Sequence, residues 1–125
     1  QGDGRGVIAD VSCGTGFVAR RLAASGKFRR VVALDFSREM LGELVASTRR
    51  DRGAPKRLAV VRGDAGELPF ATESLDAVHW GAAMHCVPDA ERALGEIHRS
   101  MRPGARLYAT TFLRPFPDVV FRFFE

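Results

Sequence analysis

Val7-Ile8-Ala9-Asp10-Val11-Ser12-Cys13-Gly14-Thr15-Gly16 is the stretch that decides the fold. Its apolar first half predicts a short buried strand, and the glycines that follow predict a tight loop that opens a helix. A second apolar run, Val31-Val32-Ala33-Leu34, leads into the acidic residue Asp35, nineteen positions after Gly16. Strand, glycine loop, helix, strand and acid in that order predict an α/β sheet that grips the ribose of a nucleotide-like cofactor.

The chain after Asp35 keeps alternating between extended and helical patterns. Apolar runs predict three further strands, over residues 58–61, 75–80 and 107–111. Apolar stripes at helical spacing predict three helices, over residues 17–25, from a Ser37 cap to Arg50, and after an Asp89 cap. We therefore expect an α/β fold with a Rossmann-like, doubly wound parallel sheet of five strands in the order 3-2-1-4-5.

Two patterns near the C-terminus complete the predicted fold. Arg102-Pro103-Gly104 predicts a turn that ends the third helix before the fifth strand begins. The helical spacing of Phe116, Val119, Val120 and Phe123 predicts one more helix. At this length we expect residues 1–125 to form a single domain.

Composition argues against several classes of protein. Hydrophobic residues make up 46% of the chain and charged residues 27%, as in ordinary globular domains, and no apolar run approaches the roughly 20 residues of a membrane-spanning helix. The net charge of +4 includes scattered arginine pairs, which indicate solvated helix faces rather than a nucleic-acid-binding surface. The two cysteines, Cys13 and Cys86, predict reduced thiols in an intracellular protein rather than a disulfide framework.

The residues around the glycine loop indicate which cofactor it holds. Gly14-Thr15-Gly16-Phe17-Val18-Ala19 matches the dinucleotide fingerprint, with alanine at the third glycine position. However, Asp10 would bring a carboxylate close to an anionic pyrophosphate, whereas a ligand with an amino group and a sulfonium would favour that acid. Asp64, after the third strand, can accept a hydrogen bond from an adenine amine, which leaves Asp35 for the ribose hydroxyls. These acids predict an adenosine ligand with a positively charged arm.

These motifs resemble those of class I S-adenosylmethionine-dependent methyltransferases, the small-molecule type that includes quinone-biosynthesis enzymes. The stretch from Asp10 to Gly16 looks like the glycine motif of that family, and Leu34-Asp35-Phe36-Ser37 with Met40 looks like its ribose-binding segment. Segments 63–70, 75–78 and 101–104 look like the adenine loop, the fourth strand and the turn before the fifth. The resemblance covers residues 6 to about 113. It implies that the chain is a partial domain, truncated before the family's sixth and seventh strands, which would leave the fifth strand as an open edge.

The resemblance also implies S-adenosylmethionine as the cofactor and a set of residues that bind it. The implied cofactor-binding residues are Asp10, Ser12, Gly14, Thr15, Gly16, Asp35, Phe36, Met40, Asp64, Ala65 and Gly81. The two loop glycines would let the backbone approach the methionine part of the cofactor, with amides at the helix start receiving its carboxylate.

Several of these roles have an alternative. Asp10 would organise the loop and meet the amino group. Asp35 would accept both ribose hydroxyls, or act as a helix-capping acid, and Asp64 would bind the adenine or be a solvated loop carboxylate. Phe36 and Met40 would sandwich the adenine or pack in the core.

The methyl acceptor is the part of the function that the sequence defines least. His85 follows the fourth strand, where a substrate could arrive, and either acts as a general base in a substrate-binding site or is hydrogen-bonded for structural reasons. We expect His79 to be structural and His98 to be solvated. His79-Trp80-Gly81-Ala82 stands where amino-group methyltransferases carry an Asn-Pro-Pro-Tyr type sequence. The resemblance therefore implies O- or C-methylation of a small, apolar molecule.

Two rival functions remain beside the methyltransferase. The first is an NAD(P)-dependent oxidoreductase, which the glycine fingerprint favours and Asp10 and Asp64 disfavour. The second is a non-catalytic S-adenosylmethionine-binding domain that has lost its acceptor site. No metal-ligand set is expected. Segments 9–14, 82–86 and 110–114 are similar to methyltransferase-like proteins of plant and algal chloroplasts, which implies a chloroplast location, with the cytoplasm as the alternative.

Overall fold

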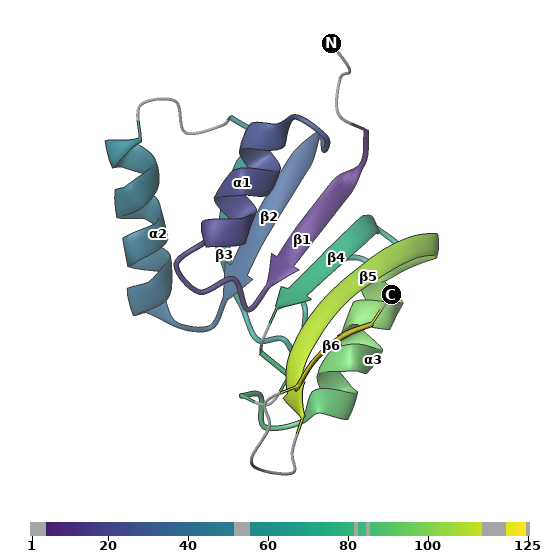
Figure 1. The fold of residues 1–125 in the computed structure, drawn as a ribbon. Coiled ribbons are helices and arrows are strands. Elements are labelled where there is room, and N and C mark those ends of the chain that lie inside the picture. Colours follow the sequence, from purple (N-terminus) through teal and green to yellow (C-terminus); the bar gives the residue numbers. More distant parts are fainter. Residues whose placement is uncertain (1–4, 52–55, 82, 85, 114–119, 125) are drawn as a thin grey trace.

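The computed structural model describes residues 5–51, 56–81, 83–84, 86–113 and 120–124. Its strands are β1 (Val7–Val11), β2 (Arg30–Asp35), β3 (Leu58–Arg62), β4 (Leu75–Gly81), β5 (Met101–Leu113) and β6 (Val120–Phe124). Its helices are α1 (Phe17–Ser25), α2 (Arg38–Arg50) and α3 (Ala90–Ser100). The strands form one sheet in the order β3-β2-β1-β4-β5-β6 (Figure 1).

The first five strands are parallel to one another and follow the predicted order 3-2-1-4-5. The order in which strands are added to the sheet reverses after β3. The chain adds β2 and β3 on one side of β1 and then returns to add β4 on its other side. In open α/β sheets, ligands bind at the carboxyl ends of the strands at such a switch point. The fold therefore places the glycine loop, which directly follows β1, where a ligand site is expected.

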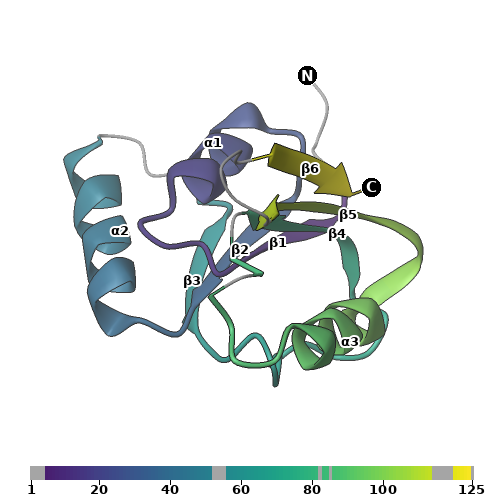
Figure 2. The ribbon, with the colours of Figure 1, turned by 60° about the horizontal axis from the view of Figure 1, so that its bottom comes forward.

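Helices cover both faces of the sheet (Figure 2). On one face, Ala19 and Ala23 of α1 and Leu44 of α2 pack against Ile8 and Val31. The other face packs against α3. Its core comprises Ala9, Val11, Leu34, Val78, Trp80, Ala93 and Ile97, among other residues. Alternate residues of the buried strands therefore contribute to different cores, which explains why these strands are apolar throughout.

The starts of two helices follow the capping chemistry predicted from the sequence. The Ser37 side chain accepts a 3.3 Å hydrogen bond from the Met40 amide at the start of α2. The Asp89 carboxylate accepts a 3.0 Å hydrogen bond from the Arg92 amide at the start of α3. Each cap satisfies one of the amide groups that a helix leaves unpaired in its first turn.

The C-terminal part of the sheet differs from the prediction in two ways. First, β5 begins at Met101 rather than at Leu107. The predicted turn, Arg102-Pro103-Gly104, therefore lies within the strand, where the pairing with β4 shifts register and Gly104 has a φ of 81°. The predicted last helix is wrong for residues 120–124, which form strand β6, while Phe116 and Val119 lie outside the described residues. A short apolar run is compatible with both structures, and an available sheet edge favours the strand.

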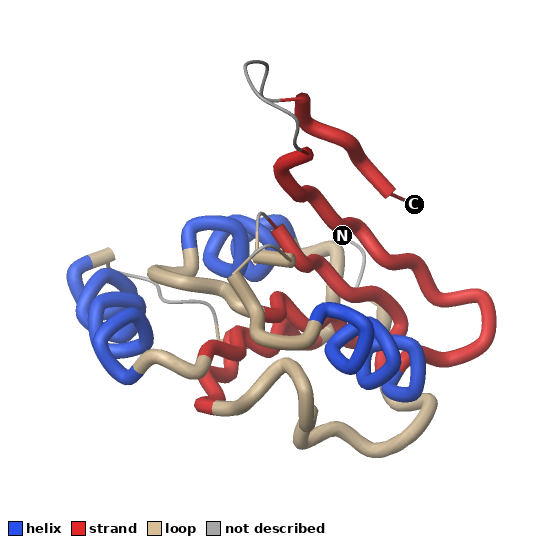
Figure 3. The backbone as a smooth tube through the Cα atoms, turned by 90° about the horizontal axis from the view of Figure 1, so that it is seen from below, coloured by secondary structure: helices blue, strands red, loops and turns tan. Residues whose placement is uncertain are grey.

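β6 also changes the expected edge of the sheet. It runs antiparallel to β5 from Leu113↔Val120 to Ala109↔Phe124, and Figure 3 shows the two strands side by side. The prediction that β5 is an open edge is therefore wrong, because its outer backbone groups pair with β6 over these residues.

Candidate functional site

The glycine loop after β1 has a backbone shape that few residue types tolerate. Ser12, Gly14 and Gly16 all have positive φ values, of 57°, 57° and 80°. The Gly16 amide donates a 3.0 Å hydrogen bond to the Cys13 carbonyl, which closes the turn. A Cβ atom on Gly16 would lie 2.3 Å from Leu44 Cδ1, so glycine is required there for packing as well as for φ. The loop is thereby held against α2.

The start of α1 is open to a ligand. Gly16 is the N-cap of this helix and has no side chain with which to cap its amides. The Arg20 amide bonds to the Gly16 carbonyl, so the amides of residues 17–19 precede the first bond of the helical pattern. No atom lies within 4 Å of a Cβ built on Gly14. Amides that no side chain caps at a helix start are suited to an anionic group such as a carboxylate.

Asp35, the last residue of β2, is bonded to the glycine loop. Its Oδ2 accepts a 2.8 Å hydrogen bond from the Gly14 amide, and its Oδ1 accepts a 2.9 Å hydrogen bond from the Ser37 amide. A carboxylate offers about four acceptor positions, so each oxygen retains capacity for a further donor. Asp35 can therefore stabilise the loop and accept two neighbouring hydroxyl groups at the same time.

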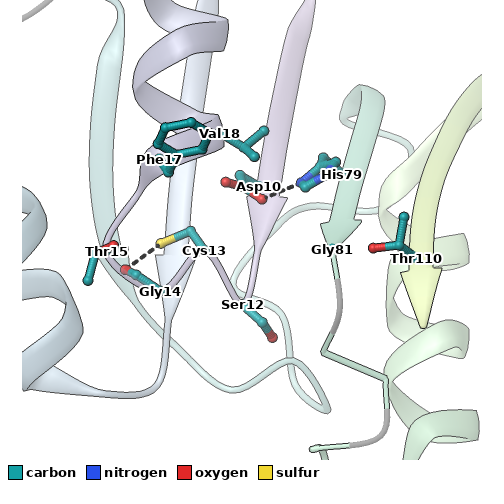
Figure 4. Close-up of a pocket in the computed structure, with 10 residues that line it drawn as sticks. All are labelled: Asp10, Ser12, Cys13, Gly14, Thr15, Phe17, Val18, His79, Gly81 and Thr110. Atoms are coloured by element: carbon teal, nitrogen blue, oxygen red, sulfur yellow. Dashed lines mark hydrogen bonds and ion pairs between the residues drawn. The ribbon is translucent and has the colours of Figure 1, made fainter. Parts of the chain in front are cut away.

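Asp10 is almost fully buried and is hydrogen-bonded to a histidine of the neighbouring strand. Its Oδ1 lies 2.7 Å from Nδ1 of His79 on β4, and the two residues are partners in the β1–β4 register. The exposed fraction of the side chain is 3% for Asp10 and 23% for His79. The other oxygen of Asp10 is turned away from His79 (Figure 4). The imidazole thus shields one side of the carboxylate.

A cleft of about 470 Å³ opens at the carboxyl ends of β1 and β4, beside the start of α1. Figure 4 shows the residues that line it. They are Asp10, Ser12, Cys13, Gly14, Thr15, Phe17, Val18, His79, Gly81 and Thr110. Five of the residues predicted to bind the cofactor are in this set: Asp10, Ser12, Gly14, Thr15 and Gly81.

The other predicted residues lie around the cleft or away from it. Phe36 and Met40 follow Asp35 and have exposed fractions of 67% and 44%, so neither side chain is in the core. The guanidinium of Arg62 lies 5.2 Å from the centre of the Phe36 ring, and its Nε donates a 2.9 Å hydrogen bond to the Phe36 carbonyl. Both side chains are available to a flat ligand beside Asp35.

The segment after β3 is not brought into this cleft. Asp64 is exposed, and its Oδ1 accepts a 2.8 Å hydrogen bond from the Gly66 amide two residues later. Ala65 is 8% exposed and belongs to the core beneath α3. The adenine-binding roles of these two residues stay predictions. His85, predicted in the substrate site, lies outside the described residues.

Some lining residues were not predicted as site residues. They are Cys13, Phe17, Val18, His79 and Thr110. Phe17 and Val18 belong to the glycine fingerprint and Cys13 directly precedes it, so their position at the cleft followed from the motif. His79 and Thr110 reach the cleft because β4 and β5 lie next to β1 in the sheet, and only the register reveals this.

Cys13 is an unreactive thiol within the loop. Burial, and then the charges of Asp10 and Asp35, raise its pKa to about 12. Its Sγ donates a 3.5 Å hydrogen bond to the Gly14 carbonyl. A thiol becomes nucleophilic only as the thiolate, so this residue packs the loop rather than performing chemistry.

The charged and polar groups in and beside the cleft fit the ligand expected from the sequence. Asp10 offers a buried carboxylate for a positive charge, the start of α1 offers amides for a negative one, and Asp35 offers acceptors for a ribose. An amino acid arm joined to a nucleoside carries all three groups. Among the described residues, His, Cys, Asp and Glu side chains do not gather in a group of three that could hold a metal ion. In the same part of the chain, each helix is too short or too polar to span a membrane.

Comparisons with known proteins show which family of domains has this fold and this glycine loop. Residues 9–109 match the family described as "Methyltransferase domain". The chain is 45% identical over 115 residues to an uncharacterised chloroplastic methyltransferase of Arabidopsis thaliana, covering 90% of this chain and 33% of that protein. It is 37% identical over 109 residues to the chloroplastic 2-phytyl-1,4-beta-naphthoquinone methyltransferase of the same plant, covering 84% and 41%.

Solved structures agree with the sequence comparison. The crystal structure of an S-adenosylmethionine dependent methyltransferase from Mesorhizobium loti superposes with a TM-score of 0.74 at 27% identity, covering 88% of this chain and 48% of that one. The chain therefore spans between a third and a half of the length of these proteins.

Proposed function

The chain belongs to the methyltransferase domain family, and on that premise we propose that it carries the cofactor site of an S-adenosylmethionine-dependent methyltransferase acting on a small, apolar molecule. In this proposal residues 1–125 lie in one methyltransferase domain. The acceptor is methylated at oxygen or carbon. One relative named above acts, by its name, on a naphthoquinone, which supports an acceptor of this kind.

One observation carries the proposal. Two carboxylates at the ends of adjacent strands, Asp10 and Asp35, flank a glycine loop whose helix has no capping side chain. A pyrophosphate would be repelled by the buried Asp10, whereas the ammonium and sulfonium of an S-adenosylmethionine arm would be stabilised by it. This charge pattern favours the methyl donor over NAD(P).

The residues of the cleft would hold the donor rather than activate it. When bound, S-adenosylmethionine supplies a methyl group on a sulfonium, which is already reactive, so positioning accounts for most of the catalysis. Asp35 would accept the ribose hydroxyls, and Phe36 and Met40 would contact the adenine. Asp10 would bind the ammonium, and the amides at the start of α1 would receive the carboxylate.

The relatives also support a proposal for the cellular compartment of this protein. The two Arabidopsis proteins named above are chloroplastic, and we propose the same compartment for this protein. Imaging of a fluorescent fusion of the full-length protein tests this, and cytoplasmic fluorescence would contradict it.

Thermal unfolding tests the choice of cofactor. S-Adenosylhomocysteine, the demethylated product, at a hundred times its dissociation constant should stabilise the full-length protein by about 2.7 kcal/mol. NAD at the same concentration should leave the unfolding temperature unchanged. Stabilisation by NAD alone would favour the oxidoreductase instead.

Methyl transfer itself separates an enzyme from a non-catalytic binding domain. The assay uses radiolabelled S-adenosylmethionine with quinols and phenols as acceptors. Binding of S-adenosylhomocysteine without transfer to any acceptor would favour the binding domain.

A further inference from the structure

Three residues on adjacent strands form a row beside the cleft. Asp10 of β1 is the register partner of His79 on β4, and His79 is the register partner of Tyr108 on β5. Partners in a parallel sheet point to the same face. The imidazole therefore stands between a buried carboxylate, 2.7 Å from its Nδ1, and an aromatic residue with an exposed fraction of 43%.

The hydrogen bond to Asp10 sets the tautomer of His79. A carboxylate only accepts hydrogen bonds, so the short contact to Asp10 Oδ1 puts a hydrogen on Nδ1. In the neutral ring Nε2 is then the acceptor, with its lone pair directed away from Asp10.

Gly81 gives the imidazole its position at the carboxyl end of β4. A Cβ atom on Gly81 would lie 2.7 Å from Cε1 and 3.1 Å from Nε2 of His79. The ring edge that carries Nε2 therefore occupies the space that a side chain at residue 81 would fill. Both residues line the cleft, so this edge of the ring is on the ligand side.

Asp10 divides the cleft into two parts. Figure 4 shows the glycine loop and the start of α1 on one side of Asp10, with Phe17. On the other side are His79, Gly81 and Thr110, from β4 and β5. The first part carries the amides and carboxylate oxygens suited to the donor. The second part carries the imidazole of His79, and the exposed Tyr108, its register partner on β5, lies outside the cleft lining.

We propose that His79 is the catalytic base that takes the proton of an aromatic hydroxyl, and that Asp10 is its positioning residue. This inference rests on the proposed methyltransferase function. It names the acceptor class as hydroxyarenes, meaning phenols, naphthols and hydroquinones. It also assigns His79 a chemical role in place of the structural one expected from the sequence.

The step conserves atoms and charge. The O–H bond of the acceptor breaks, its proton goes to His79 Nε2, and the electron pair stays on oxygen. That oxygen, or the ring carbon beside it, forms a bond to the methyl carbon of the sulfonium donor. The carbon–sulfur bond breaks with its pair left on sulfur. For attack through carbon, the proton at that carbon then leaves to water, which restores the aromatic ring.

The acidity of the acceptor decides whether a base is needed. A phenol such as tyrosine has an ordinary pKa of about 10, so at neutral pH its proton must be taken up by a base as the oxygen attacks. An acceptor that is already ionised at neutral pH needs no base. The dependence of a His79 variant on acceptor acidity is therefore a readout that a purely structural histidine would not change.

The first experiment compares His79→Gln with the wild-type full-length protein. Calorimetry with S-adenosylhomocysteine should give dissociation constants within about threefold, because His79 does not hold the donor. Methyl transfer to 1-naphthol should fall roughly 10²–10³-fold, the range of general-base catalysis. Transfer to 2,4-dinitro-1-naphthol, already ionised, should fall less than about fivefold, because the variant lacks only the proton-transfer contribution. His98→Gln on the exposed face of α3 is the matched control and should behave as wild type.

The second experiment needs no turnover. Nitrogen-15 NMR of histidine-labelled protein should show the Nδ1-protonated tautomer for His79 and a change of that signal in Asp10→Asn. Asp10→Asn should also lower the rate with 1-naphthol more than with the dinitro compound.

Each contrary outcome is distinct. If the wild-type protein did not bind S-adenosylhomocysteine, the proposed function would be overturned. Loss of that binding only in His79→Gln would make His79 a donor-binding residue and overturn this inference alone. Equal rate losses for both naphthols, or no transfer to either naphthol by wild type that binds S-adenosylhomocysteine, would also overturn it.

Discussion

The amide of Gly14 donates a 2.8 Å hydrogen bond to Oδ2 of Asp35, which joins the loop after β1 to the last residue of β2. The other oxygen of Asp35 accepts from the Ser37 amide at the start of α2. One carboxylate thus connects two strand ends and a helix start. Any ligand that bonds to Asp35 also contacts a part of the structure that sets the shape of the loop.

Replacement of Asp35 by alanine should therefore affect both stability and binding. Removal of two hydrogen bonds from backbone amides to a carboxylate should lower the free energy of unfolding by about 2 kcal/mol. Stabilisation by S-adenosylhomocysteine should disappear, because the ribose loses its acceptors. Denaturant unfolding with and without this ligand measures both effects.

Glu43→Ala is the control for the Asp35 variant. Glu43 forms an exposed ion pair with Arg50 on α2, and such pairs contribute less than about 1 kcal/mol. If Asp35→Ala retained the full ligand stabilisation, the ribose site would lie elsewhere.

Two glycines of the same loop should respond differently to alanine. Gly16→Ala places a Cβ atom 2.3 Å from Leu44 Cδ1 at a φ of 80°, and we expect a loss of about 2–4 kcal/mol from overlap and backbone strain. Gly14→Ala meets no atom within 4 Å and should lose only about 1 kcal/mol. Urea unfolding of the two variants measures the difference. Equal losses would show that the contact with Leu44 does not constrain the loop.

Asp76 should make stability depend on pH in the acid range. A hydrogen bond from the Val7 amide, with further help from Arg102, lowers the pKa of this carboxyl. Because the folded pKa is below the unfolded one, the stabilisation is present above the unfolded value and is lost as pH falls through the folded value. Unfolding measured between pH 6 and about pH 2 should show this loss in wild type.

Asp76→Asn isolates that effect. The variant should be less stable than wild type near neutral pH, and the difference should shrink as the solution is acidified below about pH 4. Glu67→Gln, at an exposed loop carboxylate, is the control. A difference between Asp76→Asn and wild type that stayed constant with pH would exclude the charge as its cause.

His79 and Gly81 should be energetically coupled. Gly81→Ala pushes a methyl group against the imidazole, which must then move away from Asp10. We expect a cost of about 1–2 kcal/mol in wild type and close to none in a His79→Ala background, where the space is free. A double-mutant cycle by denaturant unfolding measures the coupling. If the stability losses of the two substitutions were additive, the imidazole would move aside without losing its hydrogen bond to Asp10.

Much of the fold was predictable because its signals are local. The glycine loop, the Ser37 and Asp89 caps and the apolar runs each report on a few neighbouring residues, and the helices and first four strands lie within one or two residues of their predicted bounds. The segment Val120–Phe124 was mispredicted because its choice of structure depends on a distant partner, the exposed side of β5. A pattern of apolar residues cannot report on such a partner.

The site was predictable to the same extent. Residues of the glycine motif line the cleft, and Asp35 contacts the loop, as the order of strand, loop and acid implied. The Asp10–His79 pair was missed because its members are 69 positions apart and meet only through the register of β1 and β4. Asp64 was expected beside the ligand, yet its nearest donor is the Gly66 amide in its own turn.

The high pKa of the Cys13 thiol has a consequence for oxidative chemistry. With a pKa of about 12, roughly one Cys13 in ten thousand is ionised at pH 8. Peroxides and alkylating reagents attack thiolates, so this sulfur is protected first by its burial and then by the charges of the two acids of the ligand site, Asp10 and Asp35. The loop should keep its shape through swings in cellular redox state, without depending on a reductant for repair.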